Sequence, residues 1–566
     1  MQDRSVSLRW FVLAASTLNF YCEASRAQSD DANASPKSTV SELPRLGPGD
    51  FPEVENGWYR MPPWAEDLPF DIEAKFAIPP NQNREQSYCQ IFAEWNISLG
   101  YRLFPAFHAM EETDISRLRD AQLAHSREVI DFVFDREGAQ GRFEPLQTDS
   151  DFETARRLLT PYRAGLERLK RIGQRHHSFF HSEWLPSSGS RVYDGRDFTY
   201  ILALKCNSEL ASPEALLWVE LALQLKRDLV SLGDQIEQLA GASLERTVFD
   251  SMVVPILQRS DLTLAEIDRL IGILREHDKA CAASDPCLAA TEREILELRH
   301  VIHLLATSNL NTEERRKRLG LDPDTHLITA LLREVVDYGF YRINSAYVRQ
   351  EVERLAQSND VIRNAWKQAE ANWDEGDGAA EGARILLGFF LSGSFDSITA
   401  QSLEPDIAVL NTRHRQIKEA CKLPYPESTV RLSELQGSWT LDGAWQQTAF
   451  LRWFLPLDRV ATTRRSAQTC RNAYLTLAAV RRWQLQHNGQ DPSTLKLVFG
   501  EIGVSKVPVD PYSGKPLKLF SNSKSIGTYS IGPDGKDDRA EVIYDPLHSP
   551  IGTPANGDLL FVIKRQ

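Results

Sequence analysis

The feature that most constrains this chain is a repeated helical spacing of apolar residues. One stripe contains four leucines at four-residue steps: Leu217, Leu221, Leu225 and Leu229. Ser212 and Pro213 precede the stripe as an N-cap and a first-turn proline. Such a stripe lies on one face of a helix, and that face has to be buried against another element. The sequence therefore predicts helices that pack on helices.

A second stripe follows the same rule. Thr263 and Glu266 form a capping box, and apolar residues then recur at helical spacing: Leu264, Ile267, Ile271 and Leu274. The alternation typical of strands is nearly absent between residues 83 and 423. Helices joined by short loops predict stacked antiparallel hairpins similar to helical-repeat folds, although no strict sequence period is present. We expect a mainly α protein whose helical body covers residues 83–440.

The pattern changes in the last part of the chain, residues 441–566. A long helix is predicted from Ala444 to Asn488-Gly489, a pair typical of a helix C-terminus. The segments "VPVDPYSGKPLKLF", "TYSIGP" and "DLLFVIKR" then read as short strands separated by Pro, Gly and Asn. We expect a small α+β module that consists of a long helix followed by a small antiparallel sheet.

Composition and charge restrict the class of protein. The chain has 566 residues, of which 42% are hydrophobic and 25% charged, and these values are typical of a globular protein. Because this length exceeds what one core supports, about two to four domains are expected. The net charge of -13 repels phosphate backbones and anionic lipid. We therefore expect neither nucleic acid nor a membrane surface as a partner.

The first residues have the order of a targeting signal. Arg4 and Arg9 precede an apolar run, and Ser25-Arg26-Ala27 supplies small residues at the cleavage-determining positions. The run is about a dozen residues long, whereas a membrane span needs roughly 20. The sequence predicts a signal peptide over residues 1–27, and the alternative is a buried N-terminal helix. Residues 28–82 read as a tether and an extended arm rich in Pro and aromatic residues. We expect a periplasmic or secreted protein with no transmembrane segment after cleavage.

Cysteine usage agrees with export. The chain has seven cysteines, and cleavage after Ala27 removes Cys22 and leaves an even number. Cys281 and Cys287 in "CAASDPC" are close enough in sequence to form a disulfide across a turn between helices. The alternative is two unpaired thiols, and zinc is disfavoured because no second pair with ligand spacing follows. The sequence leaves the pairing of the other four open: Cys89, Cys206, Cys421 and Cys470.

The C-terminal motifs resemble a known family. In order, "HNGQDPSTL", "VPVDPYSGKPL", "YSIGPDGKDD" and "GDLLFVI" resemble the C-terminal half of the major pseudopilin of type II secretion, a type IV pilin-like protein. The processing site and the long apolar stem of that family are absent from this sequence, so the chain is similar to a pilin-derived module on the end of a larger protein. The helical body resembles a family of exported bacterial proteins with no assigned biochemical function.

The resemblance implies a calcium site in the C-terminal loop. Asp534 stands in the Asp-Gly turn, Asp537 and Asp538 follow it, and Asp558 matches the acidic residue that closes the pseudopilin loop. Calcium takes six to eight oxygen ligands, and clustered carboxylates with turn carbonyls supply them. The alternative is a solvated Asp-Gly hairpin whose carboxylates are neutralised by Arg539. The expected cofactor is calcium.

Catalytic motifs are scarce. The sequence lacks the hydrolase elbow, the zinc-protease helix motif, the phosphate-binding loop and the dinucleotide fingerprint. In "HHSFFHSEW", His177 and His181 lie one helical turn apart and Glu183 offers a third metal ligand. The alternative is a half-buried helix end whose histidines pack among aromatic residues.

Two functions from different classes follow from these observations. The first is a non-catalytic cell-envelope protein that acts as a helical scaffold for binding or assembly. The second is an exported metal-dependent hydrolase that uses the His/Glu site. The absence of catalytic motifs favours the first, and the partner of such a scaffold is not specified by the sequence.

Overall fold

A computed structural model describes residues 112–172, 188–292, 400–441 and 457–565. Short gaps lie within these ranges, at residues 135–136, 139–141, 144, 231–234, 284–285, 287, 290, 425–426, 505 and 545–555. Outside them only positions 91, 363 and 367 are described. The predicted signal peptide, tether and arm over residues 1–82 thus lie outside the described residues. None of the described helices combines the length and apolarity that a membrane span requires.

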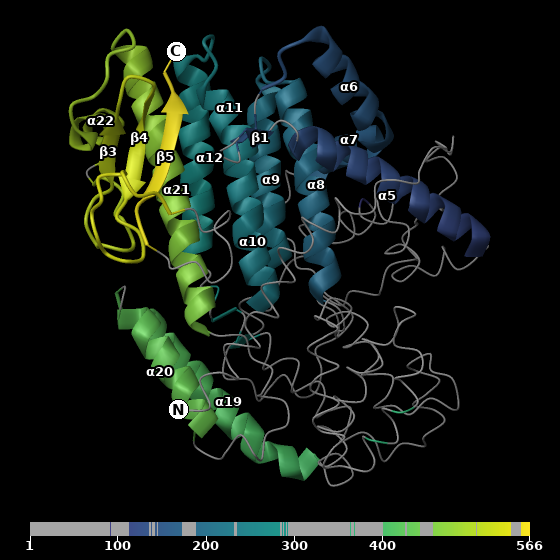
Figure 1. Ribbon diagram of the computed structural model, residues 1–566, viewed down its shortest axis with the longest axis vertical. Helices are drawn as coiled ribbons and strands as arrows, with labels where there is room; N and C mark the ends of the chain where they lie inside the picture. Colours follow the sequence, from purple (N-terminus) through teal and green to yellow (C-terminus); the bar gives the residue numbers. More distant parts are fainter. Residues whose placement is uncertain are drawn as a thin grey trace.

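The described elements are mostly helices, and a small sheet follows at the C-terminus (Figure 1). The helices of the body are α5 (Glu112–Phe134), α6 (Asp149–Leu159), η6 (Thr160–Tyr162), α7 (Arg163–Ile172), α8 (Ser188–Ser208), α9 (Glu214–Val230), α10 (Gln235–Val248), η7 (Phe249–Val253), α11 (Val254–Leu257), α12 (Leu264–Ala283), α19 (Ala400–Cys421) and α20 (Glu427–Leu441). A two-stranded hairpin pairs β1 (Glu137–Gly138) with β2 (Arg142–Phe143). The last elements are α21 (Leu457–Gln486), α22 (Leu495–Glu501), β3 (Lys518–Ser521), β4 (Ser525–Ser530) and β5 (Leu559–Lys564).

The predicted helical stripes are confirmed in α9 and, apart from the exposed Leu264, in α12, where Ile267, Ile271 and Leu274 are buried. Leu221, Leu225 and Leu229 are buried, and Leu217 packs against the same core at its edge. Helix α9 lies against α8, α10 and α12. The fully buried Trp218 completes its packed face. Burial of several side chains of this size, each worth about 1.5–3 kcal/mol, explains why these helices associate.

The helix starts that the sequence predicts are present. Thr263 and Glu266 exchange the hydrogen bonds of a capping box: the Thr263 N–H donates to Glu266 Oε2 at 2.9 Å, and the Glu266 N–H donates to Thr263 Oγ1 at 3.2 Å. At the start of α9 the Ser212 hydroxyl accepts from the Glu214 N–H at 3.2 Å. Each cap satisfies a backbone donor that the helix itself leaves unpaired.

A π-helical turn, η7, joins α10 to α11 without a break in the helix. All of its side chains are buried, and they include the carboxylate of Asp250. Asp250 accepts hydrogen bonds from Arg246 and from the Tyr474 hydroxyl of α21. The Ser251 carbonyl accepts from Asn207 Nδ2 at 2.7 Å. The turn therefore connects the helical body to α21 through polar contacts.

Helix α21 joins the body to the C-terminal sheet. It packs along α12 and α10 on one side and against β4 and β5 on another (Figure 1). The helix ends where the sequence predicts, since Asn488 and Gly489 both have the positive φ of a helix C-terminus, 54° and 82°. The predicted start at Ala444 lies outside the described residues.

The sheet has the strand order β3-β4-β5, and both pairs are antiparallel. The predicted small antiparallel sheet is therefore confirmed. Buried side chains of the sheet and of α21, such as Phe561 and Tyr474, belong to the same core cluster as Leu225 and Leu274 of the body. The rings of Phe561 and Tyr474 meet edge to face with centroids 5.7 Å apart. One apolar core thus runs from the helical body into the C-terminal module.

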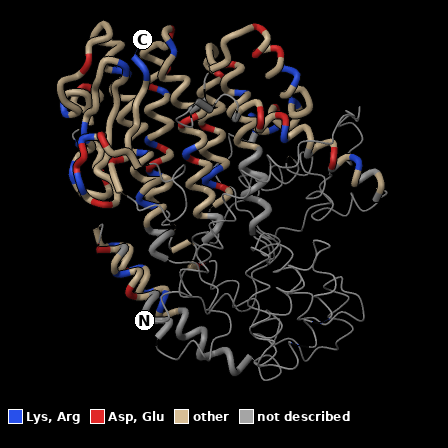
Figure 2. The backbone as a smooth tube through the Cα atoms, viewed as in Figure 1, with Lys and Arg blue, Asp and Glu red and all other residues tan. Residues whose placement is uncertain are grey.

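Charged residues of both signs alternate over the described elements (Figure 2). Ion pairs link α21 to the body, for example Arg482 to Asp268 and Arg471 to Asp278. On a mixed surface of this kind, neighbouring charges of opposite sign partly cancel one another. The functional question therefore rests on local groups of side chains.

Candidate metal centre in the C-terminal loop

The four predicted aspartates lie at the two ends of the connection between β4 and β5. Asp534, Asp537 and Asp538 follow β4, and Asp558 directly precedes β5. The two ends meet in a short parallel pairing: the Asp558 N–H donates to the Val542 carbonyl at 2.8 Å, and the Tyr544 N–H donates to the Asp558 carbonyl at 2.9 Å. Backbone pairing thus brings residues from the two ends of the loop together.

Asp510 anchors the start of this loop. Its buried carboxylate accepts from the hydroxyls of Ser513 and Ser530, both at 2.7 Å, and from the Tyr512 N–H at 3.0 Å and the Ile531 N–H at 3.3 Å. Four donors satisfy one buried carboxylate, so this aspartate has a complete structural role.

Asp558 differs from Asp510 because its carboxylate is incompletely paired. The residue is 0% exposed. Its Oδ2 accepts from the Ala540 N–H at 2.6 Å, whereas its Oδ1 has no hydrogen-bond partner among the described residues. A buried carboxylate oxygen without a partner is costly, on the order of 1–3 kcal/mol or more. Such an atom points to a ligand.

The pKa of Asp558 moves in the direction that this burial dictates. Burial raises the pKa of the Asp558 carboxyl above its ordinary value, although the backbone N–H groups of Ala540 and Asp538 act in the opposite direction. The carboxylates of Asp537 and Asp538 raise it further because they repel its negative charge. The carboxylates of Asp537 and Asp538 thus lie close enough to act on the buried carboxyl of Asp558.

The backbone of the loop is held in an unusual conformation to reach Asp558. Arg539 and Ala540 have φ values of 57° and 61°, in the left-handed region that residues other than glycine rarely adopt. This turn directs the Ala540 N–H to Asp558. Gly532 also has positive φ, and a Cβ there would lie 2.0 Å from the Gly557 carbonyl oxygen. Strained residues of this kind persist where surrounding contacts or a ligand hold them.

Asp534 and Asp537 are partnered within the loop. Asp534 accepts from the N–H groups of Lys536 at 3.1 Å and Gly557 at 3.0 Å. Asp537 forms an ion pair with Lys518 of β3 and accepts from the Tyr529 hydroxyl at 3.2 Å. The hydrogen bond with Lys518 lowers the pKa of Asp537.

The loop therefore differs from the predicted alternative in one detail. Its neutralising cation is Lys518 of the neighbouring strand, and the predicted Arg539 contributes its backbone N–H to Asp537 at 3.3 Å. Sequence spacing did not reveal Lys518 because it belongs to β3, which becomes a neighbour only through strand pairing with β4. Asp537, Asp538 and Asp558 are the carboxylates that act on one another, while Asp534 fixes the backbone of Gly557.

The other predicted sites give no support to a second metal centre. His177, His181 and Glu183 lie outside the described residues. Cys281 is a free thiol in the structure, whereas we predicted a disulfide to Cys287. Cys287 lies outside the described residues, so the bridge stays a prediction that the structure does not support.

The structure describes three of the four cysteines whose pairing the sequence left open. Cys206, Cys421 and Cys470 are buried free thiols. Cys89 lies outside the described residues.

Sequence reasoning missed one group of ionisable side chains that lie close together. Glu245 of α10 approaches His277 and Cys281 of α12, and one ligand atom from each lies within 4.8 Å of the others. In the part of the chain that the structure describes, no other set of three such side chains is this close. Only the one-turn spacing of His277 and Cys281 was visible in the sequence. The four loop aspartates do not meet this separation in the structure.

Comparisons with protein-family models, with curated proteins and with solved structures found no match to this chain. The fold and both groups of side chains are therefore argued from the residues of this chain itself.

Proposed function

We propose that this protein is an exported, non-catalytic envelope scaffold whose C-terminal module binds calcium. The basic, apolar and small-residue order of residues 1–27 supports export. A long helix packed on a small antiparallel sheet supports the resemblance of the module to pseudopilins. The observation that carries the calcium site is the buried Asp558 with its unpartnered Oδ1.

The residues present fit a hard cation. Asp558, Asp538 and Asp537 supply carboxylate oxygens that repel one another in the absence of an ion. Calcium prefers oxygen ligands from carboxylates and turn carbonyls, and the turns at Gly532, Gly535 and the Arg539 segment bring such carbonyls to the loop. When bound, the ion supplies positive charge that neutralises these carboxylates. Lys518 neutralises Asp537 from the other side.

The loop is placed to stiffen the whole module. Asp558 leads directly into β5, where Phe561 packs against Tyr474 of α21. Arg246 of the body lies over the Phe561 ring at 5.0 Å. Fixing the position of Asp558 therefore stabilises the seam, which is the contact where the sheet, α21 and the helical body meet. A rigid seam suits a protein that holds partners in a fixed arrangement.

The test is thermal unfolding of the full chain in calcium and in chelator. Binding to the native state alone stabilises it by about 2.7 kcal/mol when calcium is present at 100 times its dissociation constant. We expect a higher midpoint in calcium, and we expect Asp558→Asn to remove this difference. Asn keeps an oxygen for the Ala540 N–H and loses the charge that calcium needs.

The matched control is Asp510→Asn. This change removes a buried carboxylate of the same module that already has four donors, so it lowers the midpoint and leaves the calcium response intact. Equal curves for the wild-type chain in calcium and in chelator would overturn the calcium site. A calcium response that Asp558→Asn retains in full would move the site elsewhere.

A further inference from the structure

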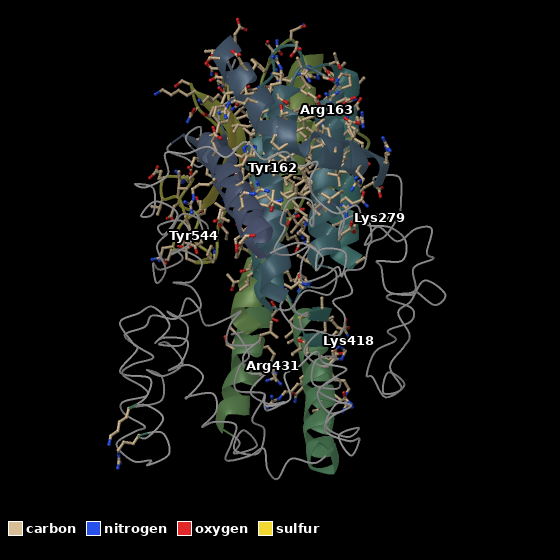
Figure 3. All side chains as sticks on the ribbon, turned by 90° about the vertical axis from the view of Figure 1, so that its right-hand side faces the viewer. Tyr162, Arg163, Lys279, Lys418, Arg431 and Tyr544 are labelled. Atoms are coloured by element: carbon tan, nitrogen blue, oxygen red, sulfur yellow. The ribbon has the colours of Figure 1, made fainter. Side chains whose placement is uncertain are left out.

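A second group of ionisable side chains lies where four helices meet. It contains one residue or more from each helix: Lys226 and Arg227 of α9, Glu245 of α10, His277, Asp278 and Cys281 of α12, and Arg471 of α21. In Figure 3, Lys279 in the same turn of α12 and Tyr544 of the C-terminal loop lie on opposite sides of the molecule. This group is therefore separate from the carboxylates of the loop.

The geometry is centred on the imidazole of His277. His277 Nε2 lies 2.5 Å from Glu245 Oε1 and 3.6 Å from Cys281 Sγ. Lys226 Nζ lies 3.8 Å from the same sulfur and 3.4 Å from Glu245 Oε2. Glu245 and His277 are each about 1% exposed, whereas Cys281 is half-buried. Cys281 is thus less buried than the Glu245 and His277 that flank its sulfur.

The protonation of His277 follows from Arg227. Arg227 Nη1 lies 2.7 Å from His277 Nδ1, and a guanidinium only donates, so Nδ1 accepts. The ring proton of the neutral imidazole therefore sits on Nε2, between Glu245 and the sulfur. In a Cys–His–carboxylate hydrolase the thiol and the carboxylate contact opposite ring nitrogens. Here both contact Nε2, so the group is not built for that proton relay.

A metal ion does not suit this group either. Arg471 Nη1 lies 3.2 Å from Glu245 Oε2, and Arg471 Nε lies 3.0 Å from Asp278 Oδ1. Together with Lys226 and Arg227, three cationic side chains already surround the carboxylate, the thiol and the imidazole. A divalent cation would be repelled by them and would have to displace the proton on Nε2. The excess of cations favours a bare negative sulfur instead.

The electrostatics at Cys281 agree with this conclusion. Burial and Glu245 raise the pKa of the Cys281 thiol, but the charge of Lys226 and the hydrogen bond from His277 act against them, and the pKa is lowered to about 6. Two other cysteines show the opposite shift. Burial raises the pKa of the Cys206 thiol, and it also raises that of Cys470, although Arg246 contacts that sulfur at 3.4 Å.

We propose that Cys281, held between Lys226 and His277, is a redox-reactive thiolate that reduces hydroperoxides. The sulfur attacks the terminal peroxide oxygen, an S–O bond forms and the O–O bond breaks. The thiolate becomes a sulfenic acid, the sulfur losing two electrons, and the hydroperoxide is reduced to an alkoxide. The Lys226 ammonium supplies the proton that converts the alkoxide into an alcohol, and water restores it. Thiolates that are accessible and close to cations are the cysteines that react in this way.

The first test is the alkylation rate of Cys281 in the reduced full chain, followed by mass spectrometry from pH 5 to 9. At pH 6 about half of a thiol with a pKa near 6 is ionised, roughly 150 times the fraction of an ordinary thiol. The lower nucleophilicity of such a thiolate removes about tenfold of this advantage. We expect Cys281 to react roughly tenfold faster in the native chain than in the same chain unfolded in urea. The buried Cys206 and Cys470 provide the opposite internal control, since folding slows them.

The second test uses variants and peroxide. Lys226→Met moves the midpoint of the Cys281 profile upward by about one to three pH units, and Lys226→Arg restores it. The control is Lys205→Met. Lys205 is not part of this group, and its Nζ pairs with Glu209 Oε1 at 2.5 Å. In a Cys287→Ser chain, which cannot condense with the nearest cysteine in sequence, a hydroperoxide gives a dimedone adduct on Cys281 alone. A Cys281 that reacts as slowly as Cys206, or that forms no adduct, overturns the proposal whatever the variants do.

Discussion

The C-terminal loop and the junction of α9, α10, α12 and α21 both gather carboxylates, yet they differ in how much positive charge surrounds them. In the loop, Asp537 and Asp538 raise the pKa of the buried Asp558, whose Oδ1 has no partner among the described residues. At the junction, Lys226 and Arg471 both contact Glu245. A deficit of cations leaves room for a hard metal ion, whereas an excess of cations stabilises a thiolate. Local charge, more than the presence of acidic residues, decides which chemistry a group supports.

The largest effect is expected from Glu245→Gln at the junction. This change leaves Lys226 and Arg471 buried without their shared partner, and the loss of one member of a buried pair costs roughly 3–5 kcal/mol. Chemical denaturation of the full chain measures the loss in free energy of unfolding. The control is Glu434→Gln, which removes an exposed partner of Arg431 and is expected to change stability by at most about 0.5 kcal/mol.

The effect of Glu245→Gln also depends on pH in a fixed direction. Burial raises the pKa of Glu245, but Lys226, Arg471 and His277 outweigh it and hold the pKa well below its ordinary value. A depressed carboxyl pKa stabilises the folded state above the unfolded pKa of about 4.3 and loses this contribution as pH falls toward the folded value. The difference between wild type and variant should stay constant from pH 7 to about pH 5 and shrink below about pH 4. A constant difference down to pH 3 contradicts the ion pairs.

The next effect concerns the backbone of the loop. Gly532→Ala places a Cβ against the Gly557 carbonyl at 2.0 Å, whereas Gly535→Ala at nearly the same φ meets nothing within 4 Å. Gly535→Ala should cost about 1–2 kcal/mol for its left-handed backbone alone. Gly532→Ala should cost more and should also weaken the calcium response. Equal losses from the two changes, measured by thermal unfolding in calcium and chelator, show that the two ends of the loop are not held together.

A smaller effect is expected from Cys281→Ser. The pKa of Cys281 is lowered to about 6 in the folded chain, so its thiolate stabilises the folded state above the unfolded pKa of about 8.5 and loses this contribution as pH falls through 6. The stability of the wild-type chain relative to Cys281→Ser should therefore grow by about 2 kcal/mol between pH 6 and pH 8. Cys206→Ser should show no such change, because burial raises the pKa of that thiol. Parallel pH dependence of the two variants contradicts a thiolate at Cys281.

The smallest effect is expected from Asp537→Asn. Its ion pair with Lys518 lies at the surface, with side chains about 38% and 41% exposed, and such pairs contribute about 0–1 kcal/mol. In chelator, thermal unfolding should therefore hardly change. In calcium the variant should lose part of the stabilisation, because one carboxylate is removed from the site. A large loss in chelator assigns Asp537 a structural role and removes it from the site.

The sequence predicted those parts of the fold that depend only on residues close together along the chain. The leucine stripe of α9, the capping box at Thr263 and the helix end at Asn488-Gly489 depend on neighbours along the chain, and each is confirmed. The three strands at the C-terminus were likewise bounded by turn residues. The packing of α21 on both the body and the sheet was not predictable, since it depends on which faces meet.

The two groups of side chains show the same division. Three of the loop aspartates stand in one short motif and Asp558 directly precedes the next strand, so the sequence was enough to group them. Glu245, His277 and Cys281 come from two helices, and Glu245 and His277 are 32 positions apart in the sequence. Lys226 and Arg471 come from two more, and helix packing alone brings them to the sulfur. Of the side chains around the Cys281 sulfur, His277 lies one turn away on the same helix, whereas Lys226 belongs to another helix.

The most direct measurement is a calorimetric titration of the full chain with calcium, repeated on Asp558→Asn and on Cys281→Ser. The contrast between the two regions predicts binding that Asp558→Asn abolishes and Cys281→Ser leaves unchanged. A parallel titration with zinc should give the same result for the wild-type chain and for Cys281→Ser, because the cations around that sulfur exclude a metal. Calcium binding that persists in Asp558→Asn, or zinc binding that disappears in Cys281→Ser, would contradict the assignment of the two regions.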